Sequence, residues 1–392
     1  MKILSVNAGS SSLKFTLFNM PSEEVIVSGT FEKIKLSDSF YTIKYNGEKI
    51  RKETYFPTHK EAVQTLLDEL ISMNIISSYE EIDGVGHRVL HGGNKYPNSV
   101  LIDQDVIDMV DELTPFGPLH NPANLTGIRS FKEVLPNTPQ VAVFDTSFHQ
   151  TMNEEEFLYA VPYSWYKDYG IRKYGFHGTS HKFITKRMEE ILGKNEKIIS
   201  CHIGNGASIC AIDNGECIDT SMGITPMAGV MMGTRCGDID ASLIPFVCKY
   251  TSKSLDETID SLNKESGVLG ISGVSSDMRD IENGYNEGND RCKLAINMYV
   301  KKLVNYISMY NTLLGGTMNI VFTAGVGENS DLIRRLVCNK LECIGVSIDN
   351  SKNDGLRGKE ALISSDSSKV KVYVIPTNEE AMIAKDTFDI IR

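Results

Sequence analysis

The chain has 392 residues and a formal net charge of −11, with 41% hydrophobic and 23% charged residues. This length accommodates two or three domains with sizeable cores, and the composition is typical of a soluble globular protein. The acidic charge without a basic stripe argues against a nucleic-acid partner, and no apolar run reaches the length of a membrane-spanning helix. The eight cysteines contain no C-x-x-C pair, which favours free thiols in the reducing cytoplasm.

The first eighteen residues predict a strand, a polar loop and a second strand. Lys2–Val6 is a short apolar run, and Leu13–Phe18 alternates apolar and polar residues. Between them, the small residues of Asn7–Ser12 leave backbone N–H groups able to face an anion, and Lys14 adds charge. This pattern indicates a phosphate loop, although an ordinary hairpin turn uses the same residue types.

The same layout recurs halfway along the chain. Ile198–His202 and Ile209–Asp213 are predicted strands on either side of a loop, Gly204–Ser208. Ser12 and Ser208 lie half a chain length apart, so the pattern predicts a duplicated domain with phosphates bound between the halves. The P-loop signature G-x-x-x-x-G-K-[ST] is absent from the sequence.

Candidate ligand residues follow several of the other predicted elements. A strand over 82–89 carries Arg88 near its end, and a strand over 140–144 is followed at once by Asp145. Loops beyond the carboxyl ends of strands hold the ligands of α/β sheets. Arg235 lies in a long glycine-rich loop, and Gly325–Asn329 follows a strand as a turn that leads into a helix, which is typical of an anion site.

Six motifs occur along the chain in a specific order: Asn7–Lys14, Gly86–Gly93, Phe144–His149, Tyr174–His181, Met231–Asp240 and Gly325–Asn329. On these motifs, and over nearly its whole length, the chain resembles the acetate kinase (acetokinase) family. That family belongs to the superfamily of sugar kinases, actin and heat-shock ATPases. The sequence departs from the family pattern at Ala228, Cys236 and Ala241, which replace an acidic residue, a serine and a proline.

The resemblance implies an α/β fold of two duplicated ribonuclease-H-like domains with a ligand cleft between them. The acid-substrate domain is expected to comprise residues 1–148 and the terminal helix, about 379–392, and the nucleotide-binding domain residues 149–378. The implied reaction is the reversible transfer of the ATP γ-phosphoryl group to acetate, giving acetyl phosphate and ADP, with Mg²⁺ or alternatively Mn²⁺. The implied assembly is a cytoplasmic homodimer without nucleic-acid or membrane partners.

The resemblance also assigns roles by position. Asp145, His177 and Arg235 are implied to be catalytic, and Asn7 and Glu379 to serve the metal. Arg88 is implied to bind the acetate carboxylate, in a pocket whose apolar residues are Leu90, Leu119, Phe176 and Pro226. The implied nucleotide contacts are Lys14, His202, Ile203, Gly204, Asn205, Gly206, Asp277, Met278, Arg279, Gly325, Val326, Gly327, Glu328 and Asn329.

Elementary chemistry agrees with these roles. Phosphoryl transfer depends on positioning and positive charge, which the forked guanidinium of Arg235 supplies. His177 can donate a hydrogen bond to the same group when it is protonated or in the correct tautomer. A carboxylic acid with a pKa of roughly 4 to 5 is already ionised at pH 7, so no general base is required. We therefore interpret Asp145 as a residue that orients an arginine or the metal.

Other functions use parts of the same pattern. A propionate or butyrate kinase differs only in the length of the acid. A kinase for a hydroxyl substrate, or an actin-like or chaperone-type ATPase, leaves Arg88 without an evident role. Glu379 and Glu380 are also acidic residues of the kind that favour a helix N-terminus. The remaining motif histidines are interpreted as structural: His87, His91, His120, His149 and His181.

Overall fold

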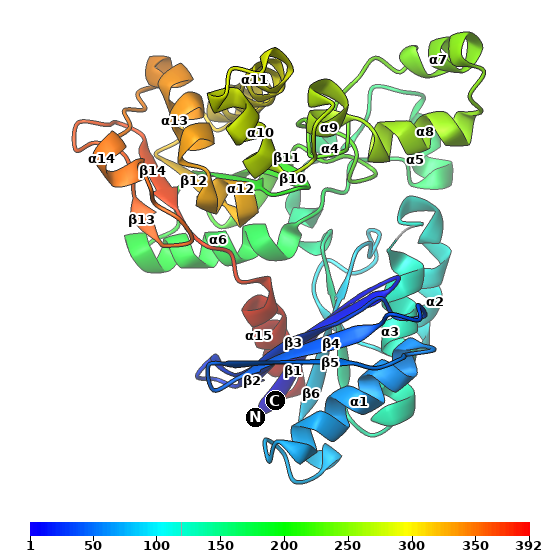
Figure 1. The fold of residues 1–392 in the computed structure, drawn as a ribbon. Helices are drawn as coiled ribbons and strands as arrows, with labels where there is room; N and C mark the ends of the chain where they lie inside the picture. Colours follow the sequence, from blue (N-terminus) through cyan, green and yellow to red (C-terminus); the bar gives the residue numbers. More distant parts are fainter. Residues whose placement is uncertain (119) are drawn as a thin grey trace. The chain divides into compact units, whose positions relative to one another are not determined.

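The computed structural model describes residues 1–118 and 120–392, and it divides into two compact units. The first unit comprises Met1–Gln150 together with Asn378–Arg392, and the second comprises Thr151–Thr377. The chain colours of Figure 1 show that the C-terminal helix α15 packs with the N-terminal part of the chain. The first unit is therefore discontinuous in sequence.

The first unit is built on an eight-stranded sheet with the order β5-β4-β3-β2-β1-β6-β8-β7. Strands β1 to β5 pair antiparallel with their sequence neighbours, whereas β1, β6 and β8 are parallel and β7 is antiparallel to β8. The strands are β1 (Lys2–Gly9), β2 (Ser12–Asn19), β3 (Glu24–Glu32), β4 (Phe40–Tyr45), β5 (Glu48–Glu53), β6 (Gly84–Val89), β7 (Val100–Leu101) and β8 (Gln140–Phe144).

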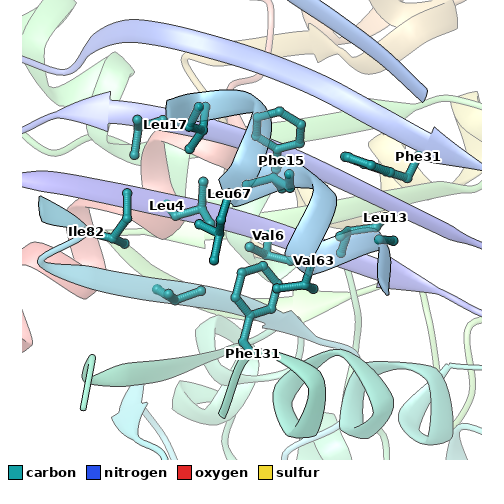
Figure 2. Close-up of a cluster of buried hydrophobic side chains, with 14 of the residues drawn as sticks. Leu4, Val6, Leu13, Phe15, Leu17, Phe31, Val63, Leu67, Ile82 and Phe131 are labelled. Carbon is teal, nitrogen blue, oxygen red and sulfur yellow. The ribbon is translucent and has the colours of Figure 1, made fainter. Parts of the chain in front are cut away.

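Helices cover both faces of this sheet. Because side chains alternate along a strand, Leu4 and Val6 of β1 face one core, whereas Ile3 faces the other. The larger core packs the sheet against α1 and against Phe131 of α3, as Figure 2 shows. The smaller core packs it against α15. The helices are α1 (His59–Ser72), α2 (Gln104–Glu112), α3 (Asn121–Val134) and α15 (Glu379–Ile391), with short 3₁₀ turns at Tyr79–Glu81, Thr114–Phe116 and Ser147–Thr151.

Helix α15 approaches strand β6 closely because β6 contains glycine where the two elements cross. A Cβ atom on Gly86 would lie 2.2 Å from Oγ1 of Thr387 and 2.6 Å from Cγ2 of Ile383. Asn378 caps the helix, and its side chain accepts a hydrogen bond from the amide of Ala381 at 3.0 Å. This packing fixes Glu379, the first helical residue, relative to β6.

The second unit repeats the strand order of the first. Its six-stranded sheet has the order β11-β10-β9-β12-β14-β13, in which β9, β10 and β11 are antiparallel and β9, β12 and β14 are parallel. The segment β3-β2-β1-β6-β8 of the first sheet has this same pattern of order and direction. The predicted α/β class with two duplicated ribonuclease-H-like sheets is therefore confirmed. The strands are β9 (Ile198–Ile203), β10 (Ala207–Asp213), β11 (Glu216–Thr220), β12 (Asn319–Thr323), β13 (Ala361–Leu362) and β14 (Lys371–Val374).

Helices make up most of the rest of the second unit. They are α4 (Glu154–Phe157), α5 (Tyr163–Tyr169), α6 (Gly178–Leu192), α7 (Leu243–Thr251), α8 (Leu255–Lys264), α9 (Gly267–Ser272), α10 (Met278–Asn286), α11 (Asp290–Leu313), α12 (Ala324–Asn329), α13 (Asp331–Lys340) and α14 (Asn350–Asn353), with a 3₁₀ turn at Glu342–Ile344. Within residues 1–118 and 120–392, no helix combines the length and apolar character needed to cross a membrane.

Two predicted loops are shorter than the sequence suggests. Strand β1 continues through Gly9, which pairs with Ser12 at the start of β2, so only Ser10 and Ser11 form the turn. The backbone of Asn7–Gly9 is part of the ladder, which makes the predicted phosphate loop here wrong in extent. In the second unit the loop is Gly204–Gly206, because Ala207 and Ser208 already pair with β9.

A third predicted turn is a helix. The segment Gly325–Asn329 lies within α12, which begins directly after β12 at Ala324. Ala324 has a φ of +65°, a left-handed conformation that is uncommon for a residue with a side chain. This backbone reversal lets the strand pass into the helix without a connecting loop.

Candidate active site

Arg88 and Asp145 form a paired charge in the first unit. Arg88 near the end of β6 donates from Nε to Oδ1 of Asp145 at 3.0 Å and from Nη2 to Oδ2 at 2.7 Å. Asp145 follows the parallel neighbour β8 and is completely buried, whereas the Arg88 side chain remains 23% exposed. The negative charge of Asp145 raises the pKa of the Arg88 guanidinium above its ordinary value. The carboxylate thus holds the arginine in one orientation and keeps it charged.

Two glutamates at the start of α15 lie near this pair. Burial raises the pKa of Glu379 to about 7, and the nearby charges of Asp145 and Glu380 raise it while Arg88 lowers it. Glu380 forms an ion pair with Lys14 of β2, which is paired in the ladder with Asn7 of β1. The three carboxylates outnumber Arg88 and Lys14, so this part of the unit carries surplus negative charge and oxygen ligands suited to a hard divalent cation.

A small cavity of about 340 Å³ lies beside the Arg88 side chain. Its walls come from the adjoining ends of β1 and β2, from the end of β6 and from the start of α3. The lining residues are Asn7, Ala8, Gly9, Ser12, Lys14, Arg88, Leu90, His120 and Asn124. Asn124 fixes two of these walls, because its side chain accepts from the Leu90 amide and donates to the Ala8 carbonyl, both at 3.0 Å. A cation and an apolar side chain thus face one small space. Leu119, also predicted here, lies outside the described residues.

A larger cavity of about 790 Å³ lies in the second unit. Eight predicted nucleotide residues line it: Gly204, Asn205, Asp277, Met278, Arg279, Gly325, Val326 and Asn329. They come from the β9–β10 loop, from the N-terminal end of α10 and from both ends of the short helix α12. Asp277 caps α10 and pairs with Arg279, and this hydrogen bond lowers the pKa of Asp277 to about 2. Helix N-termini, glycines and an arginine at one cavity form a site that suits an anionic ligand.

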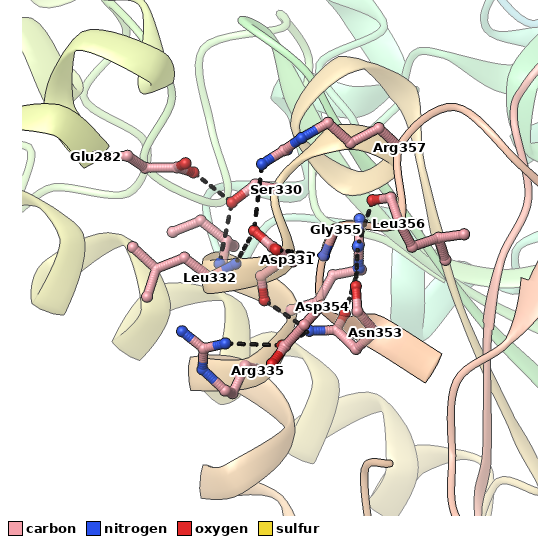
Figure 3. Close-up of polar contacts among 12 residues, drawn as sticks. Glu282, Ser330, Asp331, Leu332, Arg335, Asn353, Asp354, Gly355, Leu356 and Arg357 are labelled. Carbon is pink, nitrogen blue, oxygen red and sulfur yellow. Dashed lines mark hydrogen bonds and ion pairs between the residues drawn. The ribbon is translucent and has the colours of Figure 1, made fainter. Parts of the chain in front are cut away.

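The rim of this larger cavity is held by polar contacts between residues 330–335 and 353–357 (Figure 3). Asp331 accepts from the Gly355 amide at 2.7 Å, and its other carboxylate oxygen lies 3.5 Å from Nη2 of Arg357. Ser330 donates a hydrogen bond to Glu282, and burial raises the pKa of this glutamate. Glu282, Ser330 and Arg357 all line the cavity.

His177 and Arg235 meet above the β9–β10 loop. A Cβ atom on Gly206 would lie 3.4 Å from Nη1 of Arg235 and 3.5 Å from Nε2 of His177. Nη1 of Arg235 also donates to the carbonyl of Pro226 at 3.1 Å. His177 has a φ of +58° where it begins α6, the kind of strained backbone that the surrounding structure must hold in place. Nη1 of Arg235 and Nε2 of His177 therefore both border the space beside the Cα atom of Gly206.

Comparison with known proteins gives the family. The sequence profile of the acetokinase family matches residues 2–385. Acetate kinase from Geobacillus sp. strain WCH70 is 56% identical over 388 residues, which cover 98% of this chain and 98% of that protein. The chain belongs to the acetokinase family. The family and the enzyme class predicted from the motifs are thus confirmed, and the protein is a kinase.

Two solved structures resemble this acetokinase over its whole length. The acetate kinase of Porphyromonas gingivalis has a TM-score of 0.95 and 47% identity and covers 100% of both chains. A propionate kinase from Francisella tularensis has a TM-score of 0.94 and 39% identity and covers 99% of both chains. The same fold therefore occurs in an acetate kinase and in a propionate kinase.

Several predicted site residues of the acetokinase are not part of either cavity lining. Ile203 is completely buried, and Glu328 accepts a hydrogen bond from the Thr377 amide at 3.1 Å. Burial raises the pKa of Glu328. His202 stacks on His177 with ring centroids 4.0 Å apart. The others, also in the second unit, are Gly206, Gly327, Phe176 and Pro226.

Sequence reasoning missed lining residues that no motif contains. Arg357, Glu282 and Tyr299 of the acetokinase line the larger cavity from a loop and two helices far apart in sequence. The only available signal was the charged pair Asp354 and Arg357 around Gly355, in a segment otherwise typical of a surface turn. Their position at the cavity comes from tertiary packing.

Proposed function

We propose that this acetokinase transfers the γ-phosphoryl group of ATP to acetate, reversibly and with Mg²⁺, giving acetyl phosphate and ADP. One geometric observation carries the choice of a small carboxylic acid. Arg88, held by Asp145, presents a guanidinium to a cavity of about 340 Å³ that Leu90 also lines. A carboxylate needs such a cation, and a short alkyl group needs the apolar wall.

The nucleotide is assigned to the larger cavity of the second unit. Gly204, Gly325 and the N-terminal end of α10 would receive phosphates and ribose, and Arg279 and Arg357 supply positive charge. Arg235 and His177 would donate to the equatorial oxygens of the transferring group, where charge redistributes during transfer. Acetate arrives ionised, so Asp145 acts by orienting Arg88 and accepts no proton.

The metal is assigned to Asn7 and Glu379. The raised pKa of Glu379 and its proximity to Asp145 and Glu380 support this choice, because a divalent cation there would offset crowded negative charge. Bound Mg²⁺ would neutralise phosphate charge. Lys14, which pairs with Glu380, remains our candidate for a further contact with the nucleotide.

Assembly and location complete the proposal. We assign a homodimer because apolar side chains gather, exposed, on helices α5 and α7: Tyr163, Trp165, Tyr169, Leu243, Phe246 and Tyr250. We assign the cytoplasm because all eight cysteines are free thiols.

Trapping with hydroxylamine tests the activity. The purified protein, MgATP and acetate should yield acetyl hydroxamate, one per ADP formed. Propionate and butyrate run in parallel would identify a kinase of a longer acid if either exceeds acetate in kcat/KM. ATP consumption that is the same with and without any acid would instead identify an ATPase and overturn the proposal.

A further inference from the structure

A chain of hydrogen bonds connects His177 to the buried interior of the second unit. Nδ1 of His177 lies 2.9 Å from Oγ of Ser208, and the same oxygen lies 2.8 Å from Nε2 of His181. Nδ1 of His181 in turn lies 2.9 Å from Oγ of Ser200. Ser208, His181 and Ser200 are all completely buried. This series, from His177 to Ser200, is called the imidazole relay below.

The relay is assembled from three elements. His177 is the N-cap residue of α6, and His181 lies in the first turn of that helix. Ser208 belongs to β10 and Ser200 to the adjacent strand β9. Three of the four groups, Ser200, Ser208 and His181, therefore belong to regular elements, and His177 directly precedes the helix. His177 has a φ of +58° at this position, and its ring contacts Ser208.

The hydroxyl of Ser208 has a single hydrogen and lies between two ring nitrogens. It can donate to His177 or to His181, and it accepts from the other. When Ser208 donates to Nδ1 of a neutral His177, that ring carries its hydrogen on Nε2. His181 must then donate from Nε2 to Ser208, and its Nδ1 accepts from Ser200. One choice of tautomer thus fixes the next.

We propose that Ser208 and His181 are positioning residues that hold neutral His177 as the tautomer with hydrogen on Nε2. This inference rests on the proposed function for its purpose, because Nε2 is the atom beside Arg235 above Gly206. A lone pair at Nε2 would repel the phosphoryl oxygens, whereas an N–H group there donates to them. His177 can then act as a donor at neutral pH without becoming a cation.

The His177 ring has a guanidinium and two other imidazoles as neighbours. Arg235 lies on its Nε2 side, and the ring of His202 stacks on it, with Nδ1 of His202 2.8 Å from Ser180. The third neighbour is His181, beyond Ser208. A positive charge on His177 would be repelled by Arg235. The tautomer held by the relay therefore provides the hydrogen on Nε2 that protonation of the ring would otherwise provide.

The first test reads the tautomer directly. Long-range ¹H–¹⁵N spectra of the full-length protein with labelled histidine, at pH 8, should show His177 as the Nε2–H form, and His177→Gln assigns its signals. Ser208→Ala should produce a mixture of the two tautomers, whereas Ser208→Thr, which keeps the hydroxyl, should retain the Nε2–H form. A His177 ring protonated on Nδ1 alone, or an unchanged ring in Ser208→Ala, would overturn the inference.

The second test uses the pH profile of kcat. Ser208→Ala should lower kcat about tenfold at pH 8, and the loss should shrink at acid pH once the ring is protonated, because an imidazolium carries hydrogen on both nitrogens. A loss that is the same at every pH would show a purely structural role and overturn the inference. Ser364→Ala, at an equally buried serine, is the control and should leave the profile unchanged.

These two tests separate the relay from the proposed reaction. If the protein makes no acyl phosphate but His177 shows the predicted tautomer and responds to Ser208→Ala, the reaction is wrong and the relay stands. If acetate is phosphorylated but the tautomer is unaffected, the relay is wrong and the reaction stands.

Discussion

Arg88 uses two of its five N–H donors on Asp145, and the remaining three are available to a substrate carboxylate. Chemical reasoning on the sequence led us to propose an orienting role for Asp145, since an ionised acid needs no base, and the bidentate pair with Arg88 supports this proposal. Arginine is suited to this task because its planar fork matches a carboxylate, which lysine cannot do.

Leu90 is the residue that we expect to set the preference for acid length. It is buried, lines the small cavity, and lies so near Gly117 that a Cβ atom there would be 2.9 Å from its Cδ2. Leu90→Ala should raise kcat/KM for propionate relative to acetate about tenfold, because one methylene in an apolar pocket is worth roughly 1–3 kcal/mol. Steady-state kinetics with both acids measure this ratio.

Leu125→Ala is the matched control, since Leu125 is equally buried in the first unit but does not line the cavity. Both variants should lose stability, and only Leu90→Ala should change the ratio. An unchanged ratio for Leu90→Ala would make Leu90 an ordinary core residue.

Glu379 should make the stability of the metal-free protein depend on pH. Its pKa is about 7 in the folded chain against 4.5 for a free glutamate, so the folded state retains the proton longer. Stability therefore falls as the pH rises from about 4.5 to 7, and the loss is complete above 7. Glu379→Gln removes this loss and should raise the free energy of unfolding by on the order of 1–3 kcal/mol at pH 8.

Urea unfolding of both proteins at pH 5 and pH 8, without divalent metal, checks this difference. The free energies of unfolding of the wild type and of Glu379→Gln should be nearly equal at pH 5. Glu112→Gln, at an exposed glutamate, should behave as the wild type at both values. A Glu379→Gln variant that is less stable than wild type at pH 8 would contradict the assignment.

At the scale of elements, the patterns predicted strands β1, β2, β6, β8, β9 and β10, but they did not predict where each strand ends. The Asn–Gly–Ser stretch after Val6 is typical of a loop, yet Asn7 pairs with Lys14 because the hairpin register extends the ladder to Gly9. Register depends on the partner strand, and single-strand patterns do not contain it. For the same reason Arg357 was missed, because only packing against Asp331 places it at the cavity.

The contact between α15 and β6 should be disrupted by a single added methyl group at Gly86. Gly86→Ala would place a methyl group 2.2 Å from Oγ1 of Thr387, and overpacking of this kind costs about 1–3 kcal/mol. We expect a lower unfolding midpoint, with partial recovery in the double variant Gly86→Ala/Thr387→Ala.

Gly325→Ala provides the comparison, because nothing lies within 4 Å of a Cβ atom at that position. Its stability should be unchanged within about 1 kcal/mol. If Gly86→Ala is equally well tolerated, α15 does not pack tightly on β6 in solution.

At the scale of the whole molecule, the duplication was visible in sequence only through the two short hairpins. The repeated strand order shows why this signal was sufficient, since β1–β2 and β9–β10 are the first hairpins of two equivalent sheets. The strands and helices added around each sheet differ, and so they carry no detectable repeat.

The exposed face of α7 tests the assembly. Phe246 and Tyr250 are 62% and 67% exposed, and their rings lie 4.5 Å apart. Light scattering should give twice the chain mass of 43.5 kDa for the wild type. Phe246→Ser/Tyr250→Ser should shift the protein toward the monomer, whereas a monomeric wild type would refute the dimer.

The central claim is that an oxygen of acetate becomes the bridging oxygen of an acyl phosphate whose phosphoryl group comes from the γ position of ATP. Acetate labelled with ¹⁸O in its carboxyl group tests this, with the product observed by ³¹P NMR in the presence of Mg²⁺. The account predicts acetyl phosphate whose resonance carries the isotope shift of one bridging ¹⁸O. Release of unlabelled inorganic phosphate from ATP, at a rate independent of acetate and without acetyl phosphate, would contradict it.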